Sequence, residues 1–399
     1  MQPVIPNSSL ADQIAAARPA ADHSLDSFAL LKATDFAGLR LAQFEVGLRA
    51  EEPAIIPNFP GSTLRGAFGH ALKDAVCVVS HRDCSRCILA SRCIYPFVFE
   101  STASPDSSDR LLRDQQNAPQ PYTLDPPVYD RKLKAPAPVA ASENDGEAAP
   151  RRPQWERHQS LAVGDQVVFG MTLLGRAVDH LPYLVFAIHE MTQRGMGKGR
   201  ARFAISDVAW LEPSGARRII YSGDTQRLEA PPDAAVDLSE LIALRMERLA
   251  AAGAEGETVK LRFLTPTRIK TRNELQPRPD FALLTRSLLR RASMLMQTHG
   301  QRRLDLDFGG IVARAATIGS QTAALRWWDW GRYSGRQQTR MRMGGFVGEI
   351  VYDGGKIAEF LPLLAAGELL RVGNGTSFGL GKFTVAEPGE MGVNERGDG

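Results

Sequence analysis

The chain has 399 residues, of which 43% are hydrophobic and 23% charged, and its formal net charge is +3 at pH 7. This length exceeds what one ordinary hydrophobic core supports, so it predicts two domains. No run of eighteen apolar residues is present, and the N-terminus lacks the basic and apolar regions of a secretory signal. We therefore expect a cytoplasmic protein with no membrane span.

The charge is distributed unevenly along the chain. Residues 257–386 contain 20 Lys and Arg against 10 Asp and Glu, a net charge of +10, so the other residues sum to −7. A strongly basic second half points to a polyanionic partner, most often a nucleic acid. The alternative is a solvated basic surface without such a partner.

The first half of the chain alternates between expected strands and helices. An N-terminal arm, residues 1–36, comes before them and includes a short helix near residues 10–17. A Pro-, Ala- and Arg-rich composition predicts a flexible insert over residues 102–160. The periodicities predict strands at residues 39–50, 95–100, 165–174 and 200–211, and helices at residues 62–76 and 181–192.

The second half follows a connector, residues 213–256, in which we expect a helix at residues 238–251. A frayed tail rich in Pro, Gly and Glu, residues 387–399, ends the chain. The predicted strands of this half are residues 259–264, 323–330, 345–352 and 382–386, and its predicted helices are residues 280–298 and 357–370.

Each half thus reads strand, helix, strand, strand, helix, glycine-rich loop, strand. This order is the βαββαβ pattern of the ferredoxin-like fold, written twice. We predict an α+β protein with two tandem ferredoxin-like domains, residues 37–212 and residues 257–386, each an antiparallel sheet covered on one face by two helices. The other faces, or the cleft between the domains, remain free to hold an extended ligand.

All four cysteines of the protein lie within residues 77–93, in the spacing C-x6-C-x2-C-x5-C. Four thiolates fit a tetrahedral zinc ion, which we favour, and they also fit an iron–sulfur cluster. Thiols without a metal are the remaining alternative. A closed four-cysteine site leaves no open position for catalysis, so the metal would be structural. The predicted ligands are Cys77, Cys84, Cys87 and Cys93.

Two glycine-rich loops, the first at Gly195–Gly199 and the second at Gly373–Gly381, and an arginine-rich stretch are candidates for RNA binding. Glycines let backbone N–H groups approach phosphates, although the same loops can be tight turns of the fold. Arg326–Arg342 mixes five arginines with three tryptophans and a tyrosine, which can bind phosphates and stack on bases, unless the tryptophans are core residues. The candidates are Lys198, Arg200, Arg332, Arg336, Arg340, Arg371, Gly373, Asn374, Gly375, Gly379, Gly381 and Lys382.

Several motifs together resemble the CRISPR-associated repeat-RNA endoribonucleases of the RAMP superfamily, over residues 39–386. They are PGSTLRGAFGHAL, the cysteine-rich loop, LLGRA followed by GMGKGRARF, TPTRIK, RYSGRQQTRMRMGGFVGEI and GNGTSFGLGKF. The resemblance implies two ferredoxin-like domains that bind CRISPR repeat RNA and cut the precursor once per repeat. It implies attack of a 2′-hydroxyl on its own phosphate, without a catalytic metal, giving 2′,3′-cyclic phosphate and 5′-hydroxyl ends. The enzymes of this family often hand the crRNA product to an effector complex.

In this family the catalytic histidine commonly lies on or near the first helix, where this chain has His70. Histidine suits both proton transfers because its pKa lies near neutrality. Lys73, three residues later on the same face, would stabilise negative charge on the phosphorane, and Arg65 would hold a phosphate near the helix N-terminus. The alternative is that this helix is a packing motif, whose glycines allow close contact with the sheet.

Two other functions compete with the endoribonuclease. One is a non-catalytic RNA-binding RAMP subunit of a CRISPR effector complex, built on the same fold. The other is a metal-stapled interaction module unrelated to cleavage, which the glycine-rich loop and the basic second half disfavour.

Overall fold

The structure is a computed structural model that describes residues 30–100, 118–128, 158–229, 231, 233–253, 257–334 and 339–387. The expected helix near residues 10–17, most of the insert, Arg336 and nearly all of the tail lie outside these ranges, as do the side chains of residues 332–342. Within the described part, no helix is both long enough and apolar enough to cross a membrane.

The first sheet is antiparallel and has the strand order β3-β5-β1-β6, which is the 2-3-1-4 order of a ferredoxin-like unit. Strands β7 and β8 extend it beyond β6, and β9 pairs with β1. The strands are β1 (Arg40–Ala50), β3 (Tyr122–Asp125), β5 (Gln166–Leu174), β6 (Phe203–Leu211), β7 (Arg217–Ser222), β8 (Arg227–Leu228) and β9 (Val236–Asp237).

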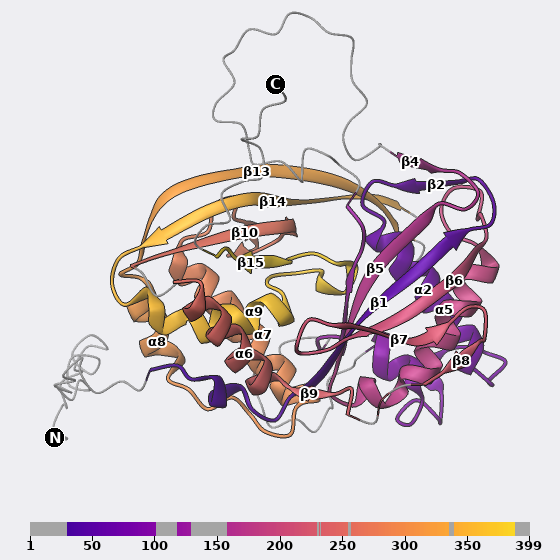
Figure 1. The fold of residues 1–399 in the computed structure, drawn as a ribbon, viewed down its shortest axis with the longest axis horizontal. Coiled ribbons are helices and arrows are strands. Elements are labelled where there is room, and N and C mark those ends of the chain that lie inside the picture. The colour runs from indigo at the N-terminus through magenta and orange to yellow at the C-terminus, as the bar shows by residue number, and fades with distance from the viewer. Residues whose placement is uncertain are drawn as a thin grey trace, which may run out of the picture. The chain divides into compact units, whose positions relative to one another are not determined.

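Two helices, α2 (Gly61–Val76) and α5 (Leu181–Arg194), cover one face of this sheet (Figure 1). Apolar residues recur along each helix at helical spacing, so each presents one stripe to the sheet. In α2 the stripe includes Leu64, Phe68 and Leu72, which are buried in the same cluster as Phe44 of β1. The sheet and these two helices therefore share one hydrophobic core.

The second sheet has the same 2-3-1-4 order, β13-β14-β10-β15, and is also antiparallel. Helices α7 and α9 are its two ferredoxin-like helices, and α6 and α8 are additions to that plan. The elements are α6 (Leu238–Ala251), β10 (Thr258–Thr267), α7 (Phe281–His299), α8 (Phe308–Ala315), β13 (Gly319–Ser334), β14 (Thr339–Asp353), α9 (Leu361–Leu370) and β15 (Phe383–Val385).

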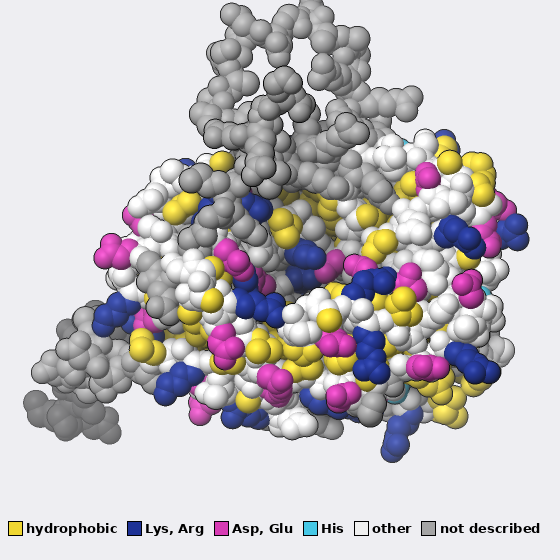
Figure 2. Space-filling view, in the orientation of Figure 1, with side chains coloured by type: hydrophobic (Ala, Val, Ile, Leu, Met, Phe, Trp, Pro, Cys, Tyr) yellow, Lys and Arg dark blue, Asp and Glu magenta, His cyan; other side chains and the backbone are white. Residues whose placement is uncertain are grey.

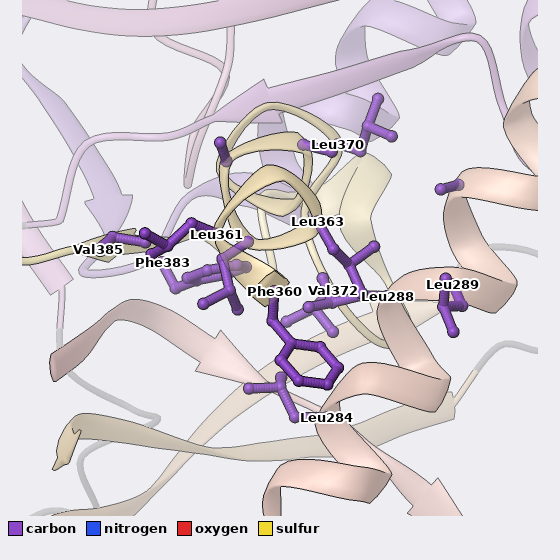
Figure 3. Close-up of a cluster of buried hydrophobic side chains, with 14 of the residues drawn as sticks. Leu284, Leu288, Leu289, Phe360, Leu361, Leu363, Leu370, Val372, Phe383 and Val385 are labelled. Carbon is purple, nitrogen blue, oxygen red and sulfur yellow. The ribbon is translucent and has the colours of Figure 1, made fainter. Parts of the chain in front are cut away.

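Helix α9 is buried on almost every side, and its residues pack between α7 and β15 (Figure 3). A Cβ on Gly367 would lie 2.5 Å from Leu288 and 2.7 Å from Phe383, so α9 approaches both elements too closely for a larger residue. Helix α7 begins at its predicted N-cap, because Asp280 accepts a hydrogen bond from the Leu283 amide at 2.7 Å. Both helices appear in the sequence prediction.

The predicted fold class, α+β with two tandem ferredoxin-like units, is confirmed by these two strand orders. Both sheets belong to one compact unit that begins at Leu31, and the predicted domain boundaries stay a prediction. Short elements complete the structure: a sheet of β2 (Ala54–Pro57) and β4 (His158–Leu161), a sheet of β11 (Lys270–Thr271) and β12 (Glu274–Leu275), and the 3-10 helices η2 (Ala33–Phe36), η3 (Cys84–Arg86), η6 (Gly175–His180), η7 (Ile357–Phe360) and η8 (Thr376–Phe378).

One predicted strand is wrong, and the second strand of the first unit is instead β3, which lies inside the predicted flexible insert. Residues 95–100 have the aromatic composition of a strand, but Pro96–Glu100 form a turn of π-helix, η4. The rings of Tyr95 and Phe99 stack at 5.5 Å with an interplanar angle of 11°, and this pair is four residues apart, a helical spacing. The aromatic residues therefore contact each other along a helical turn.

Candidate functional site

A polar cleft of about 1400 Å³ brings the first helix of one ferredoxin-like unit opposite the glycine-rich loop of the other. Helix α2, residues 95–100 and residues 118–120 line one part of it. Residues 268–270, helix α7 and residues 373–378 line the rest. This is a suitable place for an extended polar ligand, because the elements that meet there come from both units.

Helix α2 is held against its surroundings by two of its three glycines. A Cβ on Gly61 would lie 1.9 Å from the carbonyl oxygen of Phe378, and one on Gly69 would lie 2.7 Å from the ring of Phe99. Gly66 is different, because nothing lies within 4 Å of its Cβ position and it lines the cleft. The packing interpretation therefore holds for Gly61 and Gly69, while the side of α2 near Gly66 remains open.

Arg65 lies in the wall of the cleft between two aromatic rings. Its guanidinium carbon is 4.6 Å from the centre of the Phe378 ring and 5.3 Å from that of Phe99. Its Nε donates a hydrogen bond to Ser377 Oγ at 3.2 Å. Cation–π contacts on two sides fix the direction of the guanidinium, so Arg65 is a preorganised cation in the cleft.

His70 lies one helical turn further along α2, exposed, and lines the same cleft. Within the described ranges its imidazole has no hydrogen-bond partner, so both ring nitrogens are available to a ligand. Lys73 is placed elsewhere: its Nζ lies 4.9 Å above the ring of Tyr95, and it lines a neighbouring cavity rather than the cleft. The structure therefore brings together two of the three predicted catalytic residues.

The second glycine-rich loop supplies Gly373, Asn374 and Gly375 to the cleft. Gly373 has φ +79°, and a Cβ there would lie 2.4 Å from the carbonyl oxygen of Arg268, so only glycine fits. The backbone amide of Asn374 donates a hydrogen bond to that same oxygen at 3.0 Å. The side chain of Asn374 is exposed on the loop.

The prediction that Arg371 binds RNA is corrected by its position. Arg371 is 2% exposed, and its Nη2 donates to both carboxylate oxygens of Asp125, at 2.6 and 2.7 Å. Lys382 Nζ also contacts Asp125, at 3.0 Å. Burial alone would raise the pKa of Asp125, but the two cations outweigh it and hold that pKa below its usual value. Arg371 and Lys382 thus connect the two ferredoxin-like units.

Gly379 and Gly381 also have structural roles and do not line the cleft. A Cβ on Gly379 would lie 2.2 Å from Pro126, and one on Gly381 would lie 1.9 Å from the carbonyl oxygen of Val372. Both have positive φ, +87° and +76°, which favours glycine. These glycines allow the loop to pack against the first unit and against itself.

The first glycine-rich loop lies apart from the cleft. Lys198 and Arg200 are exposed, but neither lines it, and the Lys198 amide donates to the carbonyl oxygen of Ile55 at 2.9 Å. Arg332 and Arg340 lie on β13 and β14, where Arg340 pairs with Tyr333 and Arg332 with Met341. Arg332 and Arg340 therefore lie on two paired strands, and Arg336 lies outside the described residues.

Two of the three tryptophans in the same stretch are core residues. Trp328 and Trp330 are each 3% exposed and contact Phe59, with ring centroids 5.6 and 5.2 Å apart. Trp327 is 40% exposed, and its Nε1 donates to Asp329 at 3.0 Å. Trp328 and Trp330 are therefore core residues, as the alternative interpretation of this stretch required. Of the three tryptophans, Trp327 is the one exposed enough to stack on a base.

The sequence analysis missed most of the cationic wall of the cleft. Four cations line it from the segment between β10 and β11, from β11 and from α7: Arg268, Lys270, Arg290 and Arg291. The adjacent arginines at the end of LLRR and the TPTRIK motif were the available signals. Figure 2 shows Lys and Arg interspersed with Asp and Glu on one face of the molecule, so the positive charge on that face is not a continuous patch.

The four cysteines line one cavity of about 330 Å³ beside the cleft. All four are free thiols and partly exposed. No group of three or more His, Cys, Asp and Glu side chains in the described ranges is arranged to hold a metal ion. Asp83 and Tyr95 line both this cavity and the cleft, so the cysteine loop forms part of the wall of the cleft. The structural metal stays a prediction.

Comparisons with known proteins match the two halves separately. Residues 261–383 match the family model described as CRISPR-associated endoribonuclease Cas6, and residues 39–233 match a family model described as an N-terminal domain. An uncharacterized protein of Archaeoglobus fulgidus is 20% identical over 335 residues, which cover 83% of this chain and 92% of that protein.

The solved structures that match this chain include a Thermus thermophilus Cas6, which is 17% identical with a TM-score of 0.42, over 88% of this chain and 100% of that one. A RAMP protein described as binding different RNA substrates is 11% identical with a TM-score of 0.39, over 87% of this chain and 100% of that one. The family match spans the second sheet from β10 to the start of β15. Residues 261–383, in the second ferredoxin-like unit, are therefore similar to the CRISPR-associated endoribonuclease Cas6 family, in agreement with the resemblance carried by the sequence motifs.

Proposed function

We propose that this chain is an endoribonuclease that binds CRISPR repeat RNA in the cleft and cuts it once per repeat. The observation that carries the proposal is the composition of that cleft, in which His70 and Arg65 share one polar space with Gly373–Gly375 and the cationic wall. An available imidazole beside several cations fits phosphodiester cleavage, because a proton must move while negative charge builds on phosphorus. The Cas6 match of the second unit supports the same substrate class.

The proposed reaction needs no metal. The 2′-hydroxyl loses its proton and attacks the adjacent phosphorus, while the bond from phosphorus to the 5′-oxygen breaks and that oxygen gains a proton. The products are a 2′,3′-cyclic phosphate and a 5′-hydroxyl. His70 would serve one of the two proton transfers, and Arg65, fixed between Phe99 and Phe378, would hold the phosphate as its charge increases.

The proposed partners are the repeat RNA, the crRNA that remains bound after the cut, and the proteins of a CRISPR effector complex. One observation favours the non-catalytic RAMP subunit as a second candidate: no described residue donates to or accepts from His70 to orient it. Lys73, which was predicted to stabilise the charge on the phosphorane, also lines the neighbouring cavity and not the cleft. Both candidates use the same cleft, so only a cleavage assay separates them.

The test is incubation of the full chain, in excess EDTA, with a labelled CRISPR repeat RNA and with the same RNA carrying a 2′-deoxy nucleotide at the mapped cut. We expect one cut in the first RNA, with a cyclic phosphate end, and no cut in the second, at equal affinity. Binding of both RNAs without any cut would leave the non-catalytic subunit. A cut in the deoxy RNA, or one that EDTA abolishes, would contradict the mechanism.

We propose in addition that Cys77, Cys84, Cys87 and Cys93 hold a structural zinc ion. Their spacing and the single cavity that all four line support this proposal. Elemental analysis should find about one zinc per chain, which Cys87→Ser loses and Ser85→Ala, in the same loop, retains. Iron together with visible absorption would instead indicate the iron–sulfur cluster, and a metal-free protein with full RNA binding would contradict both.

A further inference from the structure

Arg291 is a half-buried residue whose guanidinium has no anionic partner among the described residues. Its Nε donates to the carbonyl oxygen of Leu370, whereas its Nη2 is buried and has no hydrogen-bond partner in the described ranges. None of the ion pairs found among the described residues includes Arg291. The neighbouring Arg371 differs in this respect, since it has Asp125 as its counter-ion.

Burying a guanidinium that has no anionic partner destabilises the folded protein. Burial and then the positive charge of Arg371 lower the pKa of Arg291 to about 9, so the folded protein disfavours its charged form. Buried guanidinium groups are normally paired, because removing the charge from water is not repaid by one hydrogen bond to a carbonyl. An unsatisfied buried donor therefore calls for a partner that the described residues do not supply.

The position of Arg291 indicates what that partner is. Arg291 lines the cleft from α7, together with Arg268, Lys270 and Arg290. The two carboxylates in the lining, Asp83 and Glu100, are contributed by the cysteine loop and by η4, and neither forms an ion pair with Arg291. The missing anion is therefore expected to enter from the cleft.

We propose that Arg291 forms a phosphate-binding subsite in the wall of the cleft, which takes one phosphate group of the RNA backbone. The planar fork of a guanidinium matches two phosphate oxygens, and a phosphate in the cleft would give this guanidinium the counter-ion that the described residues do not provide. Leu370 fixes the other edge of the group through Nε, so the guanidinium is held in place before the ligand arrives. The identity of the ligand as RNA rests on the proposed function, whereas the anion subsite itself does not.

The test compares Arg291→Met with Arg286→Met. Arg286 lies on the same helix, is exposed and does not line the cleft. Methionine keeps an unbranched, flexible side chain and removes the charge and the hydrogen-bond donors. We expect Arg291→Met to unfold at a temperature equal to or above that of the unmodified chain, because an unpaired buried charge is removed. We also expect it to bind repeat RNA about tenfold more weakly, with the slope of log affinity against log salt smaller by about 1.

A second arm uses inorganic sulfate without RNA. Sulfate should raise the unfolding temperature of the unmodified chain and of Arg286→Met, and should raise that of Arg291→Met less. Equal sulfate stabilisation of all three, or RNA affinity and salt slope unchanged in Arg291→Met, would overturn the subsite. A sulfate effect that depends on Arg291 in a chain that does not bind repeat RNA would keep the subsite and refute the proposed function.

Discussion

The contact between Asp125 and Arg371 gives the sharpest quantitative prediction about how the two units are held together. Asp125 lies at the end of β3 in the first unit, and Arg371 and Lys382 flank the glycine-rich loop of the second. The side chains of Asp125 and Arg371 are 17% and 3% exposed. Asp125→Asn keeps the shape of the side chain but leaves a buried guanidinium without its counter-ion.

The expected loss follows from that burial. Breaking a buried ion pair by removing one partner costs about 3 to 5 kcal/mol, so Asp125→Asn should lower the free energy of unfolding by that amount at pH 7. The exposed pair of Asp179 with Arg40, whose side chains are 53% and 42% exposed, is the matched control. Asp179→Asn should cost no more than about 1 kcal/mol.

Urea titrations of the three proteins at pH 7 measure this difference. The double variant Asp125→Asn with Arg371→Met should recover most of the loss, because it removes both partners. The pKa of Asp125 is held below its usual value of 3.8 in the folded state. The contribution of Asp125 to the free energy of unfolding is therefore complete above pH 3.8. It disappears as the pH falls through the lower folded pKa. A loss below about 1 kcal/mol for Asp125→Asn at pH 7 would refute the reasoning.

Two further predictions concern helix α2 and a buried histidine. Gly61→Ala should lower the free energy of unfolding by about 1 to 3 kcal/mol, because the added Cβ meets the Phe378 carbonyl oxygen at 1.9 Å. Gly66→Ala should raise the free energy of unfolding by about 1 kcal/mol, since the Cβ position is open and alanine favours a helix interior. Chemical denaturation measures the free energy of unfolding of both variants. Equal effects of the two substitutions would contradict the described packing. Burial lowers the pKa of His299, whose Nε2 lies 2.6 Å from the Pro119 carbonyl oxygen. Stability should therefore fall as the pH drops below about 6.5 towards the lower folded pKa, and this dependence should weaken in His299→Gln; an identical pH profile in that variant would assign the effect to other groups.

The fold was predictable because local patterns and strand order agree. Helix α7 has its N-cap at Asp280 and an apolar stripe that includes Leu284 and Leu288, and both features can be recognised without a structure. Residues 95–100 show the limit of such patterns, since the contact between Tyr95 and Phe99 along the chain outweighs their preference for strands.

The candidate site was predictable only in part. His70 and Arg65 stand out because both lie on the first helix, where the resemblance stated above places the catalytic histidine. Arg371 looks like a phosphate-binding residue beside its glycine-rich loop, yet its partner Asp125 is 246 positions away in the sequence. The role of Arg291 depends on which neighbours it lacks, and a sequence pattern cannot show the absence of a partner. Long-range pairing therefore decides which cations remain available to a ligand in the cleft.

The most direct test of the account is the single-turnover rate of repeat-RNA cleavage in EDTA for His70→Ala beside His158→Ala. His158 is an exposed residue at the start of β4 that does not line the cleft. The account predicts that His70→Ala cuts about 100-fold more slowly or not at all, with RNA affinity within about twofold, while His158→Ala keeps the full rate. Cleavage by His70→Ala at the full rate would contradict the assignment of the active site to this cleft.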